Sequence, residues 1–228
     1  MREIVLDTET TGLDPAAGHR IVEIGAIELQ HHLPTGREYH VYLDPEREMP
    51  EDAYAVHGLS EDFLAGKDKF ADVAYAFLDF IGDAPLVIHN AAFDLKFVNA
   101  ELALAGREAI DEARAIDTLP IARQKFPGAR ASLDALCQRF EIDLAMRDKH
   151  GALIDSHLLA AVYLELVGGR QPGFDLAADA GRPAAAENAE RLRREPRRHL
   201  PGASASAAER AAHREFLKKI DDPIWRAE

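Results

Sequence analysis

The stretch Ile4-Val5-Leu6-Asp7-Thr8-Glu9-Thr10-Thr11-Gly12 passes from an apolar run through two acids into a tight turn. The apolar residues 4–6 predict a short buried strand. Asp7 and Glu9 follow that run two residues apart, and on an extended chain such residues project to the same face. Open α/β sheets place their sites at the carboxyl ends of strands. If this strand is the central one, its two acids mark a candidate site.

The sequence beyond this stretch predicts a mixed sheet. Apolar and alternating patterns over residues 20–29 and 36–43 predict two further strands, joined by short turns as in a meander. Shorter strands are predicted later, over residues 85–88 and 115–116. Apolar periodicity predicts helices over residues 70–81, 93–104, 132–140, 154–167 and 207–220. Strands that are followed by strands alternating with helices indicate an α/β fold with a mixed sheet.

The composition of the 228-residue chain is that of an ordinary globular protein, with 47% hydrophobic and 29% charged residues. The chain holds no apolar stretch of the roughly 18 residues that would span a membrane. Its first residues soon reach an acid, which is not the pattern of a secretory signal. A single cysteine, Cys137, excludes an internal disulfide and a cysteine-based zinc site, and favours a reducing, cytoplasmic setting.

Charge and composition divide the chain into three parts. The net charge of −13 argues against a protein that holds nucleic acid on its own, because phosphate binding normally requires a basic face. Residues 1–170 hold 16 Lys and Arg against 30 Asp and Glu, whereas residues 171–228 hold 11 against 10. Residues 171–213 lack Val and Ile, so they cannot bury enough apolar surface to offset their chain entropy. We expect a folded domain over residues 1–170, a flexible linker over 171–206 and a C-terminal segment over 207–228.

Two further acids stand in settings that draw attention to them. Asp94 would lie at the start of the helix after the fourth strand, where the helix dipole favours an anion, with a plain N-terminal cap as the alternative. Asp155 lies early in a largely apolar helix, and a buried carboxylate is costly unless it is paired or bound to a metal. His150 precedes Asp155 by five residues. It is either a functional residue or an ordinary surface histidine.

Three motifs now stand in order along the chain: Asp7-Thr8-Glu9-Thr10-Thr11-Gly12, Asn90-x-x-Phe93-Asp94 and His150-x-x-x-x-Asp155. Together they resemble the exonuclease motifs of the DEDD superfamily, in the subgroup that has a general-base histidine. The segments Val56-His57-Gly58-Leu59, Ile116-Asp117-Thr118-Leu119 and Ser132-Leu133-Asp134-Ala135-Leu136-Cys137 are similar to the proofreading-subunit family of bacterial DNA polymerase III. The resemblance covers about residues 2–170. It implies a ribonuclease H-like α/β fold, with a five-stranded mixed sheet that has helices on both faces.

The resemblance also implies the chemistry of the site. Two divalent ions, Mg²⁺ or Mn²⁺, would activate a water and neutralise charge at the phosphate, and such hard ions prefer oxygen ligands. Asp7 would bridge the ions, Glu9 and Asp155 would complete the site of the catalytic ion, and Asp94 would help to hold the second. His150 would accept the proton of the attacking water, because a neutral imidazole suits base work near neutral pH.

Four other residues are assigned to the terminal nucleotide by the same resemblance. Backbone groups of Thr10 and Thr11, with Val56 and His57, would line its pocket. The alternative for Val56 is simple packing, and the alternative for His57 is a turn position before a glycine. His89 ends a predicted strand next to the site, and it stays outside the catalytic set because a core histidine with a backbone partner fits it as well.

The tail predicts contacts with other proteins. Trp225, the only tryptophan, lies beyond the linker, and tryptophan is favoured as a binding anchor. We expect residues 207–228 to dock on the polymerase alpha subunit, with a helix packed on its own domain as the alternative. Gln171, Phe174 and Leu176 resemble the peptide that bacterial sliding clamps bind, with a plain linker as the alternative.

The predicted function is the removal of mismatched nucleotides from the 3′ end of DNA during replication. An RNA-trimming exonuclease with the same metal site is the second hypothesis, and the long linker and the Trp-bearing tail argue against it. A structural polymerase subunit without catalysis is the third. The complete set of Asp7, Glu9, Asp94, His150 and Asp155 argues against that hypothesis.

Overall fold

The computed structural model describes residues 1–144, 149–168 and 205–219 of the chain. The chain divides into two compact units, Met1–Gly173 and Phe174–Glu228. The predicted linker lies outside the described residues, apart from its last two positions. The clamp-like residues Gln171, Phe174 and Leu176 also lie outside the described residues, as does Trp225.

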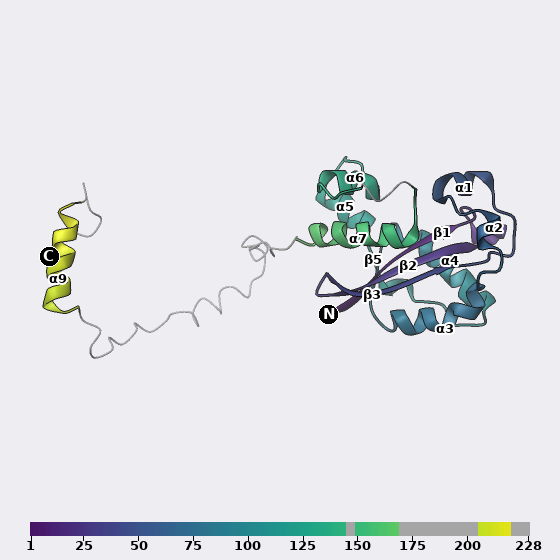
Figure 1. Cartoon of the computed structure of the whole chain (residues 1–228), viewed down its shortest axis with the longest axis horizontal. Coiled ribbons are helices and arrows are strands. Elements are labelled where there is room, and N and C mark those ends of the chain that lie inside the picture. Colours follow the sequence, from purple (N-terminus) through teal and green to yellow (C-terminus); the bar gives the residue numbers. More distant parts are fainter. Residues whose placement is uncertain (145–148, 169–204, 220–228) are drawn as a thin grey trace, which may run out of the picture. The chain divides into compact units, whose positions relative to one another are not determined.

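The first unit is built on a five-stranded mixed sheet (Figure 1). Its strands are β1 (Arg2–Thr10), β2 (Ile21–Gln30), β3 (Leu33–Tyr42), β4 (Leu86–Ile88) and β5 (Ala115–Asp117). Their order is β3-β2-β1-β4-β5, so that β1 is the central strand. β1, β2 and β3 are antiparallel neighbours, whereas β4 is parallel to both β1 and β5. The predicted meander followed by two later strands is confirmed.

The first strand is longer than the sequence predicts. The apolar run ends at Leu6, but β1 continues to Thr10 because each residue as far as Thr10 stays paired with β2. Asp7 and Glu9 therefore lie inside the strand and do not follow it, which corrects the prediction. Both acids still lie near the carboxyl end of the central strand, where the site was expected.

Helices enclose the sheet on both faces. They are α1 (Glu51–His57), α2 (Glu61–Leu64), α3 (Phe70–Ile81), α4 (Ala91–Leu104), α5 (Thr118–Lys125), α6 (Leu133–Arg139) and α7 (Ala152–Leu166), with short 3-10 turns at Pro15–Ala17 and Glu112–Arg114. α3, α4, α6 and α7 match the predictions within three residues at either end. α1, α2 and α5 were not predicted, because they are short and carry no sustained apolar stripe.

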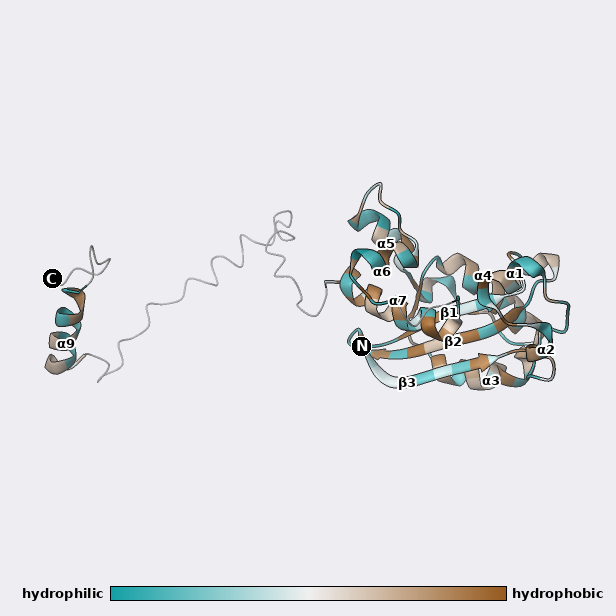
Figure 2. Ribbon diagram, turned by 45° about the horizontal axis from the view of Figure 1, so that its top comes forward, coloured by the Kyte–Doolittle hydropathy of each residue, from teal (hydrophilic) through white to brown (hydrophobic). Residues whose placement is uncertain are grey.

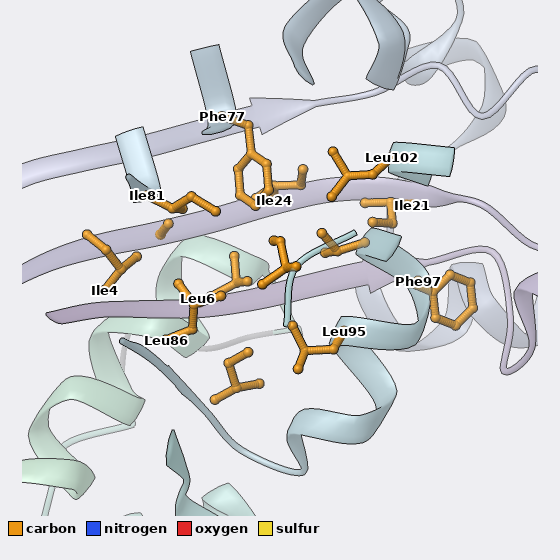
Figure 3. Close-up of a cluster of buried hydrophobic side chains, with 14 of the residues drawn as sticks. Ile4, Leu6, Ile21, Ile24, Phe77, Ile81, Leu86, Leu95, Phe97 and Leu102 are labelled. Carbon is orange, nitrogen blue, oxygen red and sulfur yellow. The ribbon is translucent and has the colours of Figure 1, made fainter. Parts of the chain in front are cut away.

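One face of the sheet packs on α3 and α4. The predicted stripe of α3 is confirmed, since Phe70, Phe77 and Ile81 are fully or almost fully buried. α4 shows almost no amphipathic pattern, because its buried residues include Asp94 and Glu101. Figure 3 shows this core with side chains from the sheet and from both helices: Ile4, Leu6, Ile21, Ile24, Phe77, Ile81, Leu86, Leu95, Phe97 and Leu102.

The other face of the sheet packs on α7, which lies across it in green in Figure 1. Val5 and Ile27 contribute to this second core from the sheet, and Leu159 and Tyr163 contribute from the helix. α5 and α6 pack on the far side of α7 in a third cluster. Because residues alternate between the faces of a strand, Val5 and Asp7 share the face that meets α7.

The described part of the second unit is the helix α9 (Ala207–Leu217). Ser206 caps it by accepting a hydrogen bond from the backbone N–H of Glu209, whose carboxylate accepts one from the backbone of Ser206 in return. Hydrophilic residues cover much of α9, and its hydrophobic residues include Phe216 and Leu217 (Figure 2). Among the described residues, no helix is both long and apolar enough to cross a membrane.

Candidate active site

Three separate segments bring carboxylates to one point of the first unit. Asp7 and Glu9 come from β1, Asp94 from the first turn of α4 and Asp155 from the first turn of α7. Glu9, Asp94 and Asp155 are buried, and Asp7 is partly exposed because it lines a cavity.

Electrostatics show how closely these carboxylates are grouped. The surrounding protein raises the pKa of the Asp7 carboxyl well above its usual range, first by desolvation and then through nearby negative charges. In order of effect, these charges belong to Asp94, Glu9, Asp155 and Glu23. Such a group holds either protons or a cation, because neighbouring carboxylates in a low-dielectric setting cannot all stay ionised alone.

Thr8 fixes Asp94 against β1. Its backbone N–H and its hydroxyl both donate hydrogen bonds to Oδ1 of Asp94, at 3.1 and 2.7 Å. These hydrogen bonds lower the pKa of the Asp94 carboxyl, but burial outweighs them and raises it to about 7. The sequence analysis missed Thr8, although it stands between the two acids of the first motif.

Gly25 allows α7 to approach the sheet closely enough to deliver Asp155. It lies directly opposite Asp7 in the β1–β2 pair. A Cβ atom at this position would overlap the backbone of Ala152 and Leu153 at the start of α7. The Ser156 hydroxyl donates a buried hydrogen bond of 2.9 Å to the Gly25 carbonyl. The contact between β2 and α7 therefore sets the position of the third motif relative to the first.

His150 lies before α7 and beside Asp155. Its Nδ1 is 3.2 Å from Oδ2 of Asp155, and one ligand atom from each of Glu9, His150 and Asp155 lies within 4.8 Å of the others. The segment before α7 rests on α1, because the His150 backbone N–H donates to the Val56 carbonyl at 3.4 Å and Lys149 lies over the Tyr54 ring. The predicted metal and base residues are thus brought together.

The donor set fits divalent ions that prefer oxygen. It offers carboxylates from three segments, and those segments are fixed by the sheet and by two helices. The mutual repulsion that raises the pKa of Asp7 is what a bound dication would relieve. Mg²⁺ and Mn²⁺ both suit such ligands.

All four residues that were assigned to the terminal nucleotide line a cavity of about 510 Å³. Thr10, Thr11, Val56 and His57 line it, together with residues that the sequence analysis did not assign there: Thr8, Glu9, Gly12, Leu13, Asp14, Ala17, His19, Pro50, Asp52, Ala53 and Phe93. The backbone N–H of Thr11 already donates to the Arg20 carbonyl at 2.9 Å, so this amide is engaged within the protein.

His57 also belongs to the architecture of this cavity. The side chain is buried, and Nδ1 accepts a hydrogen bond of 3.0 Å from the Leu59 backbone N–H. Burial lowers the pKa of the imidazole, and the charges of Lys149 and His150 lower it further. His57 is the last residue of α1, and its neutral side chain forms part of the cavity wall.

A second cavity of about 720 Å³ opens on the other side of the acids. Asp7, His150 and Asp155 line it, as do residues that were not assigned: His89, Asn90, Leu119, Arg123, Ala129, Arg130, Ala131, Ser132 and Leu133. His89 has the partners of a structural histidine, since its Nδ1 lies 2.8 Å from the Thr118 hydroxyl and it hydrogen-bonds the Ala131 backbone. The two arginines carried no sequence motif that could have identified them.

A family model and sequence relatives establish the family. The exonuclease family model, RNase T, matches residues 4–163. DNA polymerase III subunit epsilon of Rickettsia felis is 56% identical over 179 residues, which are 77% of this chain and 78% of the relative. The same subunit of Escherichia coli is 42% identical over an alignment of length 238, which covers 99% of this chain and 98% of the relative. The chain belongs to the family of DNA polymerase III epsilon subunits.

Solved structures agree with this family. Exonuclease X in complex with 5′-overhanging duplex DNA superimposes with a TM-score of 0.58 at 26% identity, over 72% of this chain and 90% of that one. The nuclease domain of 3′hExo, a DEDDh family member bound to rAMP, shares the fold with a TM-score of 0.63 at 20% identity, over 73% and 91%. The ribonuclease H-like fold is confirmed. An epsilon-family chain with this fold is a 3′→5′ exonuclease of the proofreading type.

Proposed function

We propose that the chain removes nucleotides from the 3′ end of DNA through two divalent ions held by Asp7, Glu9, Asp94 and Asp155. The observation that carries this proposal is the grouping of these carboxylates, which raise the pKa of Asp7. When bound, Mg²⁺ or Mn²⁺ supplies an activated water and neutralises charge on the phosphate and the leaving oxygen. The bridging role of Asp7 and the supporting role of Asp94 follow the family resemblance.

His150 acts as the general base in this proposal. Its Nδ1 faces Oδ2 of Asp155 at 3.2 Å, so a proton on Nδ1 is held by that carboxylate and the basic lone pair is on Nε2. Nε2 would take the proton of the attacking water. Asp155 therefore serves both as a ligand and as the group that fixes the tautomer of His150.

The cavity beside Glu9 would receive the terminal nucleotide. Val56 and Phe93 give it apolar walls, while Thr10, Thr11 and His57 surround its inner part. A pocket of this mixed character suits a base and a sugar. DNA is the substrate we assign, because the most extensive sequence matches are to polymerase subunits.

The C-terminal segment would bring the exonuclease to its polymerase. We assign residues 207–228, with Trp225 as an anchor, to docking on the alpha subunit, and α9 supplies the helical part of that segment. Gln171, Phe174 and Leu176 would contact the sliding clamp. The chain would then work in the bacterial cytoplasm at the replisome.

The test is a time course on a 5′-labelled primer with a mismatched 3′ end, beside a matching RNA strand. His150→Gln should lower the rate about 100-fold or more, because it removes the base while keeping a polar side chain. His157→Gln is the matched control, since His150 and His157 each have a 48% exposed side chain and each pairs with one carboxylate. Equal rates for the two variants would remove His150 from the mechanism, and preferential shortening of RNA would contradict the substrate.

A further inference from the structure

The acids of the active site lie between two cavities of different character. The cavity of about 510 Å³ beside Glu9 has the mixed walls described for the terminal nucleotide. The cavity of about 720 Å³ shares Asp7, Asp155 and His150 with the catalytic site, and Arg123 and Arg130 also line it. A strand whose last nucleotide fills the first cavity must leave the site past the acids.

Among the described residues, the two arginines of the larger cavity form no ion pair. Both side chains are exposed. Arg20, in contrast, makes a two-pronged pair with buried Glu101, and Arg114 donates to backbone carbonyls. In a domain with a large excess of acids, two uncommitted guanidinium groups beside an acidic site mark a place for phosphate.

The surrounding structure fixes the backbone that carries these arginines. Arg123 belongs to α5, and Arg130 lies in the loop between α5 and α6. His89 ties this loop to the end of β4 through the Ala131 backbone, and burial together with the charge of Arg123 lowers the pKa of its imidazole. On the other side of the loop, the rings of Phe126 and Phe140 pack at 5.8 Å. Contacts within the fold therefore position the backbone of the arginine-bearing wall.

We propose that Arg123 and Arg130 bind the phosphodiester groups of the DNA strand immediately upstream of the bond that is cut. Each such group carries one negative charge, and a guanidinium matches the geometry of phosphate oxygens. The contact is independent of base sequence, as removal of any mismatched end requires. This inference rests on the proposed function and adds a second binding site for the same strand.

The test compares two substrates, one with an upstream strand and one without it. One is a short single-stranded oligonucleotide, and the other is the p-nitrophenyl ester of thymidine 5′-phosphate, which has no upstream phosphodiester. The full chain carries Arg123→Gln, Arg130→Gln or both. Arg107→Gln is the matched control, because Arg107 is equally exposed, makes no ion pair within the described residues and does not line the cavity.

The double variant should raise KM for the oligonucleotide about 10-fold at low salt and leave kcat within about twofold. The slope of log KM against log salt should fall by about 0.7 for each phosphate contact that is lost. Hydrolysis of the ester should not change, and the control should match the original chain on both substrates. Restoring the charges with Arg123→Lys and Arg130→Lys should recover most of the salt slope.

Two results would overturn the inference. An unchanged KM and salt slope in the double variant would show that the arginines do not contact the strand. An equal loss on the ester and the oligonucleotide would show that they act only by maintaining the site. Failure of the proposed function gives a different result, because the original chain would then cleave neither substrate.

Discussion

Two acids on one face of β1 have opposite environments. Glu3 is completely buried near the start of the strand, where the Tyr163 hydroxyl donates to one carboxylate oxygen and Nδ1 of His32 faces the other, both at 2.8 Å. Asp7 lies four residues further along, and its strongest electrostatic neighbours are other carboxylates. Tyr163 on α7 and His32 in the turn between β2 and β3 therefore give Glu3 neighbours that are not acids, whereas the charges around Asp7 belong to other acids.

Other buried acids of the first unit resemble Glu3. Glu28 pairs with Arg2 and Arg37. A second group pairs Glu101 with Arg20 and Glu23 with His40. A buried carboxylate with a basic partner is part of the framework, whereas carboxylates gathered around Asp7, whose pKa they raise, are suited to a cation.

The largest effect is expected from the acid that depends on a ligand. Asp7→Asn should lower the exonuclease rate about 1000-fold or more, because it removes the carboxylate that is proposed to hold both divalent ions. Calorimetry should show weaker binding of Mn²⁺ by the same variant. Glu3→Gln should retain metal binding and most of the activity. If Glu3→Gln lost as much metal binding and activity as Asp7→Asn, the distinction between Glu3 and Asp7 would be wrong.

A smaller but still large effect is expected where β2 meets α7. Gly25→Ala should force the first turn of α7 away from the sheet, lower the rate about 100-fold and destabilise the fold by about 1–3 kcal/mol. Gly151→Ala is the control, since a Cβ there meets its neighbours at an ordinary 3.9 Å. Rates and thermal melts of both variants check this, and a fully active Gly25→Ala would show that α7 does not depend on this close approach.

The pH dependence of stability offers a third comparison. The pKa of Asp94 is raised to about 7 from 3.8, so the folded state keeps a proton that the unfolded state releases between these values. The stability of the metal-free protein should therefore fall by about 3 kcal/mol as the pH rises from 4 to 7. Asp94→Asn should flatten this dependence, and added Mg²⁺ should stabilise the original chain more at pH 7 than at pH 4.

Thermal melts with chelator and with Mg²⁺ measure this effect. A metal-free stability that rises over the same pH window would contradict the raised pKa. A dependence that survives Asp94→Asn unchanged would assign the effect to another group.

The smallest effect is expected at the satisfied acid. Tyr163→Phe removes the hydroxyl that donates to Glu3 and should destabilise the fold by about 1–2 kcal/mol. The rate on DNA should stay within about twofold, because Glu3 lies at the opposite end of β1 from the catalytic acids. Urea unfolding measures the stability, and a primer assay measures the rate. A strong loss of activity without loss of stability would contradict the prediction and show that Glu3 influences the site at the other end of β1.

Much of the fold was predictable because its signals are local. The apolar residues of β2 and the apolar stripe of α3 each report on a single element, and both predictions are confirmed. The short helices α1 and α5 were missed because they are positioned by contacts with distant segments. The helix α1 supports the backbone of His150, which follows it by almost a hundred residues.

The sequence by itself determined which residues form the proposed catalytic set. Asp7, Glu9, Asp94, His150 and Asp155 stand in motifs whose spacing is local, and the structure brings them to one place. Only the tertiary structure decided what holds and surrounds them. Gly25, Thr8 and the paired cavities matter because of contacts between segments far apart in the chain, and no local pattern of residues encodes such contacts.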